Sequence, residues 1–325
     1  MTQKQEKKKL IVLTGPTAVG KTELSVCLAK KLDAEIVSCD SVQVYRGMDI
    51  GSAKVTPEEM QGVPHHLIDV LDPSEDFDLY RFQAMARAAV ADIHERGKIP
   101  ILSGGTGFYI QSVIYDVDLT ENGEDPAVRA RLQEIADREG PEALHAMLRE
   151  ADPASAEAIH PNNVRKVIRA LEFLELSGTP ISEHNARERQ SVSPYDLSYF
   201  VLNRPRNELY GRIDRRVDLM MEAGLEDEVR GLLAAGIPRG GTAMQAIGYK
   251  EIAAYLDGTC TRDEAVARIK TASRHYAKRQ LTWFRRERNV QWIELSEHPD
   301  PDELTAYILE RIETGPVGGE TCTKN

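Results

Sequence analysis

The sequence has 325 residues, of which 41% are hydrophobic and 29% are charged, and its formal net charge is −11. These values exclude a disordered chain, and no apolar run reaches the roughly 18–20 residues that a membrane helix needs. The cysteines at positions 27, 39, 260 and 322 show no CxxC spacing, which favours a reducing compartment without disulfides or structural zinc. We therefore expect a cytoplasmic protein with one large or two modest domains.

The first third of the chain alternates strand and helix signals. Apolar strands are expected at 10–13, 35–38 and 99–102, and helices at 21–32 and 78–96, the second ended by Gly97. Short apolar strands separated by helices indicate βαβ units. The sequence therefore predicts an α/β fold in three layers, with a mainly parallel sheet covered by helices on both faces.

The strand signals stop near residue 118. Asp125-Pro126 opens a helix that Gly140 closes, Asp152-Pro153 opens a second, and a third spans 162–176 before Gly178. A strand at 197–202 then returns to the sheet. We interpret 118–195 as an inserted all-helical subdomain between a first core part, 1–117, and a second core part, 196–313, with a disordered tail at 314–325.

The second core part carries a strongly basic helix. Helices are expected at 208–222 and 226–235, followed by a turn at Gly240-Gly241. A capping box, Thr261-x-x-Glu264, then opens a long helix. A last strand is expected at 289–294 and a last helix at 302–312.

Between Arg268 and Arg288 there are eight Lys or Arg residues and one acid, Glu287. Arg274, Lys278 and Arg285 share one face of this helix by their spacing, and Arg279 lies beside them. Such a run is usually a solvated face, but the intervening acids of a salt-bridged helix are missing here. This favours binding to the phosphates of a nucleic acid over simple solvation, with an affinity that falls as salt is added. The aromatic residues of the same stretch are expected to pack in the core or at a hinge: Tyr276, Trp283 and Phe284.

A phosphate-binding loop follows the first strand. The pattern G-x-x-x-x-G-K-[ST] is fitted by Gly15, Pro16, Thr17, Ala18, Val19, Gly20, Lys21 and Thr22. In such a P-loop the backbone N–H groups and the lysine hold a phosphate chain, and the threonine hydroxyl is placed for Mg²⁺. The pattern predicts a P-loop NTPase-like fold and a polyphosphate ligand, but leaves open whether this is ATP, GTP or a diphosphate ester.

Two further segments follow strands of the predicted sheet. Asp40 comes after the second strand and is expected near the P-loop, because ligands bind beyond the carboxyl ends of parallel strands. From its position alone, capping a helix or a Mg²⁺-linked role is as plausible as catalysis. The glycines of Gly104-Gly105-Thr106-Gly107 after the third strand permit close approach of a ligand, although a plain strand-to-helix turn has the same pattern.

Several strings together resemble the tRNA dimethylallyltransferase, or isopentenyltransferase, family. They are the P-loop GPTAVGKT, the run DSVQVYRGMDIGSAK from Asp40, PHHLID at 64–69, GGTGFY from Gly104, and RQLTWFR at 279–285. The resemblance covers 10–292 and keeps the family order. It implies transfer of a dimethylallyl group from dimethylallyl diphosphate, assisted by Mg²⁺, to the exocyclic amine of adenosine 37, next to the tRNA anticodon.

The resemblance also implies roles for single residues. Lys21 and Thr22, with its Mg²⁺, stabilise the departing diphosphate, and an arginine of 212–216 adds a contact. We favour Arg216, although a solvated helix face would have the same pattern. Asp40 matches the family's general base, which takes a proton from the attacking amine.

The target base must leave the anticodon-loop stack to reach the donor. Where many family members have Gln-Arg, this chain has Arg165-Lys166, which favours an electrostatic role there. The stretch 245–250 matches a family tRNA contact, and the start of a helix is its equally plausible alternative. The complete set of expected tRNA contacts comprises Asp40, Ser41, Val42, Gln43, Thr106, Arg129, Arg165, Lys166, Val167, Ile168, Arg169, Gln245, Ala246, Ile247, Gly248, Tyr249, Lys250, Arg274, Lys278, Arg279 and Arg285.

Three other functions use the same P-loop: a small-molecule kinase with ATP as donor, a prenyltransferase of free adenine nucleotides, and a nucleic-acid-binding NTPase. The basic helix and the insertion argue against the first two, because neither needs a large polyanion site. A monomer is expected, with tRNA and the prenyl diphosphate as its partners and no membrane association.

Overall fold

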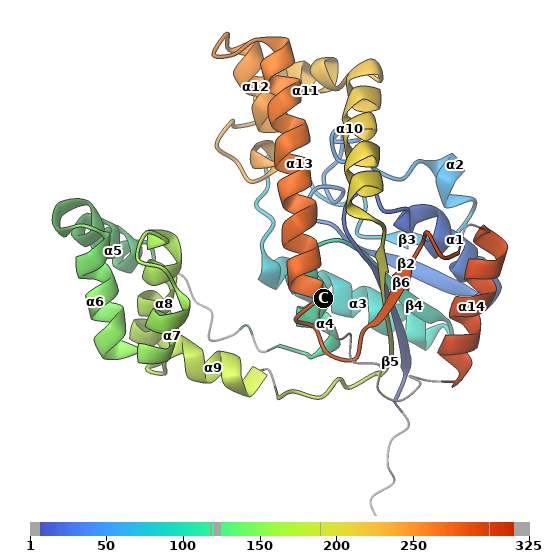
Figure 1. Cartoon of the computed structure of the whole chain (residues 1–325), viewed down its shortest axis with the longest axis horizontal. Coiled ribbons are helices and arrows are strands. Elements are labelled where there is room, and N and C mark those ends of the chain that lie inside the picture. The colour runs from blue at the N-terminus through green and yellow to red at the C-terminus, as the bar shows by residue number, and fades with distance from the viewer. Residues whose placement is uncertain (1–6, 118, 120–124, 189, 299, 315–325) are drawn as a thin grey trace, which may run out of the picture. The chain divides into compact units, whose positions relative to one another are not determined.

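The computed structural model describes residues 7–117, 119, 125–188, 190–298 and 300–314 (Figure 1). The chain forms two compact units: Met1–Ile114 with Pro194–Asn325, and Tyr115–Ser193. The boundaries expected from the sequence, 118 and 195, lie three and two residues from those of the second unit. Of the expected tail, 314–325, only Thr314 is described, and it is the last residue of a helix.

The first unit is built on one parallel sheet. Its strands, in the order β3-β2-β4-β1-β5-β6, are β1 (Lys9–Thr14), β2 (Ala34–Cys39), β3 (His65–His66), β4 (Ile99–Gly104), β5 (Asp196–Asn203) and β6 (Gln291–Glu294). Every pair of neighbours is parallel, so the predicted α/β class is confirmed. Strand β3 is not predicted, because two residues are too short for a periodic signal. The strand that ends at Gly104 is therefore the fourth along the chain, not the third.

Helices cover both faces of this sheet. Alternate residues of β1 point to opposite faces, and from Leu10 to Thr14 the residues of both sets are fully buried. Helices α1 (Lys21–Leu32) and α14 (Pro301–Thr314) share a core with Ile11 and Leu13. Helices α3 (Leu79–Glu95) and α4 (Gly107–Ile114) pack together, and α3 also contacts β2 and β4. None of the residues of α3 and α4 belongs to the core beneath α1, so these helices cover the other face.

The strand register brings three loops to one edge of the sheet. Thr14 of β1 lies beside Gly104 of β4, and Cys39 of β2 lies beside the same glycine on its other side. The three strands thus end level, and the loops that follow them meet. A Cβ atom at Gly104 would lie 2.4 Å from the carbonyl oxygen of Cys39, so only glycine fits at this strand end.

A group of further helices extends from the sheet (Figure 1). They are α10 (Arg206–Glu222), α11 (Leu225–Ala234), α12 (Tyr249–Leu256) and the long α13 (Arg262–Phe284), whereas the short α2 (Pro57–Met60) contacts α1. The capping box predicted at the start of α13 is confirmed: Glu264 N donates to Thr261 Oγ1 at 3.2 Å, and Thr261 N donates to Glu264 Oε2 at 2.8 Å. Helix α13 packs against α10 and α12.

The second unit is entirely helical in the part that the structure describes. It contains α5 (Pro126–Glu139), α6 (Pro141–Ala151), α7 (Pro153–Ala158), α8 (Val164–Ser177) and α9 (Ile181–Glu188). The predicted caps are confirmed, because Asp125 and Asp152 each accept hydrogen bonds from the first turn of the helix that follows. Helices α6 and α9 are additional to those predicted. The core includes Leu132, Leu144 and Leu148.

None of the described helices in either unit is both long and apolar enough to cross a membrane.

Candidate active site

The P-loop connects β1 to α1 in the predicted position. Gly15 and Gly20 have φ angles of 150° and 113°, which side chains rarely adopt. A Cβ atom at Gly15 would also lie 2.5 Å from the carbonyl oxygen of Leu202. Gly20 precedes α1 and offers no side-chain cap, so the first-turn N–H groups of α1 are left for a ligand, at the positive end of the helix.

Lys21 lies over this loop in a half-buried, electropositive position. Its Nζ donates to the carbonyl oxygens of Gly15 at 3.0 Å and Pro16 at 2.9 Å. Burial, and then the charge of Arg216, lower the pKa of Lys21 to about 7, while Asp40 opposes the change. This lysine is therefore poised to gain a proton when a polyanion arrives.

A cavity of about 430 Å³ opens at the edge where the three strands end. The P-loop contributes Thr17, Ala18, Gly20, Lys21 and Thr22 to its wall, and Asp40 and Gln43 stand across from them on the loop after β2. Gly15, Pro16 and Val19 are buried and support the loop without lining the cavity. Ser103, Gly104 and Gly105 complete the wall from β4. Thr106, the next residue, is partly exposed but does not line this cavity.

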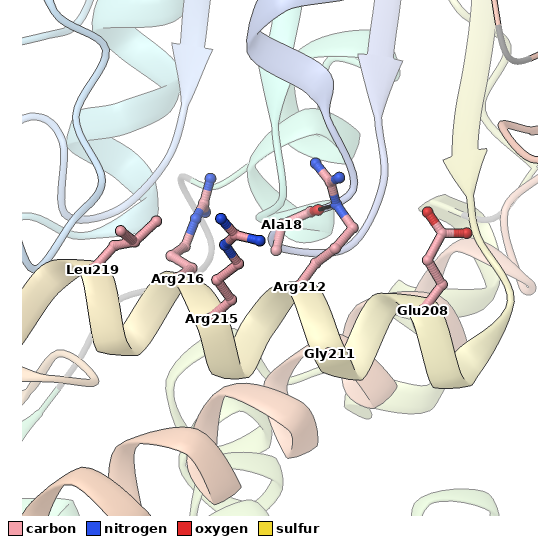
Figure 2. Close-up of a pocket in the computed structure, with 7 residues that line it drawn as sticks. All are labelled: Ala18, Glu208, Gly211, Arg212, Arg215, Arg216 and Leu219. Atoms are coloured by element: carbon pink, nitrogen blue, oxygen red, sulfur yellow. Dashed lines mark hydrogen bonds between the residues drawn. The ribbon is translucent and has the colours of Figure 1, made fainter.

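Helix α10 supplies two arginines to the P-loop. Arg212 Nε donates to the carbonyl oxygen of Ala18 at 2.8 Å, and Arg216 donates to Thr17 Oγ1 at 3.4 Å. Both line the cavity. Burial, followed by the charge of Arg212, lowers the pKa of Arg216 below its usual value. Figure 2 shows the outer side of this contact, a second pocket of about 580 Å³ where Arg215 joins the same two arginines.

Asp40 holds its own loop with one carboxylate oxygen. Oδ1 accepts hydrogen bonds from the backbone N–H groups of Val42, at 2.8 Å, and Gln43, at 3.3 Å. Because this oxygen closes a turn of the loop, Asp40 does not cap a helix. Within the described chain Oδ2 has no hydrogen-bond partner. Ser41 and Val42 are partly exposed beside it.

Gln43 has a fixed amide orientation. Its Nε2 donates to the carbonyl oxygens of Ser52 at 3.4 Å and Ala53 at 3.2 Å. Carbonyl oxygens only accept hydrogen bonds, so the NH₂ group must face them and Oε1 must point the other way. Gln43 therefore brings a hydrogen-bond acceptor to the wall of the cavity.

Sequence reasoning missed Gln280, the residue of α13 that joins the loops. Its Oε1 accepts from Thr17 N at 2.9 Å, and its Nε2 donates to Gly105 O at 2.9 Å. A Cβ atom at Gly105 would lie 2.1 Å from that Nε2, and one at Gly107 would lie 2.2 Å from the Trp283 ring. The glycine-rich turn and the RQLTWF string are therefore two sides of one contact, and reading them as a pair would have indicated Gln280.

Tyr276 differs from its expected role in core packing, because it lines the cavity. Burial, and then the nearby charge of Asp40, raise the pKa of its hydroxyl to about 12. Phe284, by contrast, is fully buried as predicted, and Trp283 packs near Phe108 with ring centroids 5.8 Å apart.

The residues present fit a Mg²⁺ ion held mainly by a substrate. The exposed side chain of Thr22 stands at the cavity wall, and Mg²⁺ commonly takes one or two protein oxygens together with phosphate oxygens and water. Among the described residues, no group of three or more His, Cys, Asp or Glu side chains could form a separate metal site.

The sequence matches two models of known protein families. Residues 43–287 match the model of the family described as IPP transferase, and residues 8–75 match that of isopentenyl transferase. The chain belongs to the IPP transferase family. The resemblance inferred from the motifs is thereby confirmed.

The similarity to relatives covers between 81% and 98% of their length. The tRNA dimethylallyltransferase of Lachnoclostridium phytofermentans is 53% identical over 300 residues, which is 92% of this chain and 96% of that protein. The one from Bacillus subtilis is 49% identical over 311 residues, or 94% and 98%. The full-length tRNA isopentenylpyrophosphate transferase of Bacillus halodurans has a TM-score of 0.71 at 48% identity, covering 95% of this chain and 98% of that one. A eukaryotic dimethylallyltransferase acting on tRNA has a TM-score of 0.81 at 31% identity, with 96% and 81% covered.

The helical unit of this IPP transferase family member separates two kinds of predicted tRNA contact. Arg165 and Lys166 are exposed on α8. Val167 and Ile168 do not fit RNA binding, because their side chains are buried in the core of the unit. Arg129 and Arg169 are partly exposed and are engaged inside the unit, since both form ion pairs at 2.9 Å with the fully buried carboxylate of Glu172. Those two arginines neutralise a buried charge within the unit.

The stretch 245–250 contains the start of α12, the alternative that its sequence left open. Gln245 and Lys250 are exposed, and Ala246 and Ile247 are partly exposed. Gly248 is buried, and so is Tyr249, whose hydroxyl donates to Glu228 at 2.7 Å. Burial and the charge of Glu228 raise the pKa of this hydroxyl. The Tyr249 side chain therefore packs inside the protein, so the prediction that it contacts RNA does not fit the structure.

The basic face of α13 is likewise divided. Arg274 donates to both carboxylate oxygens of Asp214 on α10, at 2.7 and 2.8 Å, so its charge is already compensated. Lys270 of α13 pairs with Asp218, which also lies on α10, at 2.6 Å. Lys278, Arg279 and Arg285 are exposed. For Arg274 and Lys270, the acidic partners that the sequence of α13 lacks are therefore supplied by α10.

Proposed function

We propose that this chain transfers the dimethylallyl group of dimethylallyl diphosphate to the exocyclic amine of adenosine 37 in tRNA, giving N6-dimethylallyladenosine and diphosphate. The observation that carries the proposal is that the P-loop lysine, Arg216 of α10 and the Asp40 carboxylate line one cavity, in a chain of the family to which the tRNA dimethylallyltransferases belong.

The P-loop side of the cavity suits a diphosphate leaving group. As the bond between the allylic carbon and oxygen breaks, negative charge grows on the diphosphate. The amides at the start of α1, Lys21 and Arg216 would stabilise that charge in a diphosphate bound at the P-loop. Mg²⁺ held by Thr22 and the diphosphate would neutralise part of the same charge.

The Asp40 side of the cavity suits the attacking amine. The adenine N6 lone pair is conjugated with the ring, so nitrogen becomes positive as it forms the new bond to carbon. Asp40 Oδ2 takes the N–H proton and leaves a neutral secondary amine, a step worth roughly 10²–10⁴ in rate. Gln43 Oε1 is an acceptor suited to an amine N–H and unsuited to the carbonyl that guanine carries at the same ring position.

Exposed cations supply the RNA contacts in this proposal. They are Arg165 and Lys166 on α8, Lys250 on α12, and Lys278, Arg279 and Arg285 at the end of α13. Phosphate contacts of this kind position an RNA without reading its sequence. We further propose that the enzyme acts as a monomer in the cytoplasm, where unmodified tRNA is found.

One assay separates this proposal from its alternatives. Purified protein and Mg²⁺ are mixed with an unmodified anticodon stem-loop and either dimethylallyl diphosphate or ATP, and the RNA is weighed by mass spectrometry. A gain of one five-carbon unit with the prenyl donor alone is the expected result. Three other results would each refute the proposed function and indicate a different one. They are transfer of phosphate, transfer only to free adenine nucleotides, and RNA-stimulated ATP hydrolysis without transfer.

A further inference from the structure

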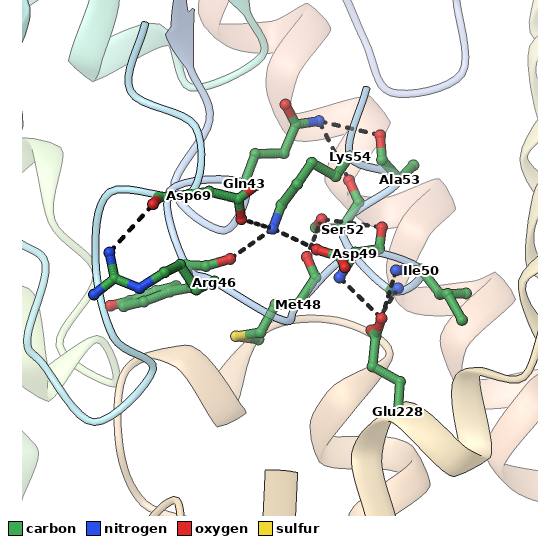
Figure 3. Close-up of polar contacts among 12 residues, drawn as sticks. Gln43, Arg46, Met48, Asp49, Ile50, Ser52, Ala53, Lys54, Asp69 and Glu228 are labelled. Carbon is green, nitrogen blue, oxygen red and sulfur yellow. Dashed lines mark hydrogen bonds and ion pairs between the residues drawn. The ribbon is translucent and has the colours of Figure 1, made fainter. Parts of the chain in front are cut away.

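A single carboxylate on α11 is bonded to the loop that follows Asp40. Glu228 Oε2 accepts from the backbone N–H groups of Asp49 at 2.9 Å and Ile50 at 2.7 Å, and Oε1 accepts from that of Gly51 at 3.1 Å (Figure 3). The hydroxyl of Tyr249 on α12 also donates to Oε1, at 2.7 Å. Three consecutive amides thus converge on one side chain that is about 180 residues away in sequence.

The loop is shaped to rest on this support. A Cβ atom at Gly51 would lie 2.6 Å from the ring of Tyr249 and 2.9 Å from Leu225. No side chain can be accommodated there, so the backbone lies directly on α11 and α12. On the other side of the loop, the nearly buried Lys54 donates to Tyr45 O and to Asp49 Oδ1, both at 2.6 Å.

The supported segment leads straight to the cavity. Ser52 and Ala53 come immediately after the three bonded amides, and their carbonyl oxygens hold the Gln43 amide. Ser52, Ala53, Gln43 and Asp40 all line the cavity. A displacement of the amides at 49–51 would therefore move the two carbonyls that orient Gln43, and would leave the P-loop contacts in place.

We propose that Glu228 is a positioning residue for the acceptor nucleoside: it fixes loop 49–53 and thereby the orientation of Gln43. The inference rests on the proposed transfer to adenosine, and Glu228 itself contacts no reacting atom. A carboxylate suits this task because it accepts several N–H bonds at once, and bonds to a charged acceptor are stronger than neutral ones.

The decisive variant is Glu228→Gln, with Glu226→Gln as its matched control. The first replaces one acceptor oxygen by an NH₂ group that cannot accept from the loop amides. The second makes the same chemical change on the same helix, at a residue paired with Arg230. With the wild-type transfer rate as reference, kcat and KM are measured separately for the stem-loop and for dimethylallyl diphosphate.

For Glu228→Gln we expect kcat/KM for the stem-loop to fall roughly 10- to 100-fold, with the KM for dimethylallyl diphosphate within about twofold of wild type. Glu226→Gln should match wild type in both. Tyr249→Phe removes one of the four donors and should lower kcat/KM for the stem-loop severalfold, which keeps the test decisive if Glu228→Gln folds poorly. A purely structural defect would instead impair both substrates alike.

Hydrogen exchange supplies a readout that does not depend on transfer. In Glu228→Gln the amides of 49–51 should exchange faster, while those of 15–22 keep their wild-type rates. Unchanged exchange at 49–51 would overturn the inference, and so would faster exchange with unchanged kcat/KM for the stem-loop. Absence of transfer by the wild type would refute the proposed function instead, so the two failures are distinguishable.

Discussion

Gln280 and Thr17 lie 263 residues apart in sequence, and yet the side-chain oxygen of Gln280 accepts the backbone N–H of Thr17 at 2.9 Å. The same side chain donates to Gly105 O at 2.9 Å. One amide therefore ties the P-loop to the turn after β4, and its donor and acceptor ends cannot be exchanged, because one partner only donates and the other only accepts.

Replacing Gln280 by glutamate should weaken binding of the diphosphate donor. The change keeps the shape but places a second acceptor against Gly105 O, leaving a buried pair without its hydrogen bond. A loss of about 1–3 kcal/mol corresponds to a rise of roughly 5- to 150-fold in the KM for dimethylallyl diphosphate. Thr282→Val on the same helix is the control, because the Thr282 hydroxyl donates to Lys278 O, away from the two loops. A donor KM unchanged by Gln280→Glu would show that this bridge does not shape the P-loop.

Asp40→Asn should separate catalysis from binding. Asparagine keeps an oxygen that can accept from Val42 N and Gln43 N, so the loop is preserved. The carboxylate that accepts the proton is lost, and single-turnover transfer should slow by roughly 10²–10⁴. Affinity for the stem-loop, measured by filter binding, should stay within a few-fold of wild type. Asp40→Ala should also lose RNA affinity, because it removes the turn. A near-normal rate in Asp40→Asn would exclude Asp40 as the base.

Binding of the donor should depend on pH through Lys21. In the free protein burial holds the pKa of this lysine at about 7, and the bound diphosphate must raise it. The protonated form is therefore fully available only well below pH 7, and affinity for dimethylallyl diphosphate should decline as pH rises through 7 towards the higher pKa of the complex.

Calorimetry without RNA in buffers of different ionisation enthalpy would measure the proton uptake directly. At pH 8 the wild type should take up close to one proton more than Lys21→Met, in which only the ligand's own ionisation remains. Equal uptake by the two proteins would place the titrating group elsewhere.

Local patterns predicted the elements that position the site. The glycines and lysine of the P-loop fix where β1 ends and α1 begins, and the predicted helix 21–32 agrees with α1 at both ends. The sequence predicted three helix N-caps correctly, because a cap is a contact between neighbours in sequence. They are Asp125, Asp152 and Thr261. Strand β3 could not be predicted from the sequence, since its two residues form a strand only by pairing with β2.

Contacts between distant segments account for what the sequence did not reveal. Arg274 has its acidic partner 60 residues away, on another helix. The hydrogen bonds of the Glu228 carboxylate likewise join α11 to a loop in the first third of the chain. Val167 and Ile168 lie next to two exposed cations in sequence, but helical geometry turns them to the core. A motif shared with a family indicates which stretch matters, and only the fold shows which side chains of that stretch are accessible.

The division of the basic helix predicts different salt dependences for neighbouring cations. Lys278 and Arg285 are exposed, so each of Lys278→Gln and Arg285→Gln should weaken stem-loop binding and lower the slope of log K against log salt by about one unit. Arg274 is held by Asp214, so Arg274→Gln should leave the slope unchanged and instead lower the melting temperature, because it leaves a carboxylate between α10 and α13 without its partner. Titrations at several salt concentrations, beside thermal unfolding of the same three variants, measure both effects. If Arg274→Gln reduced the slope as much as the other two, the Asp214 pair would have to open on binding, and the whole basic face would contact RNA.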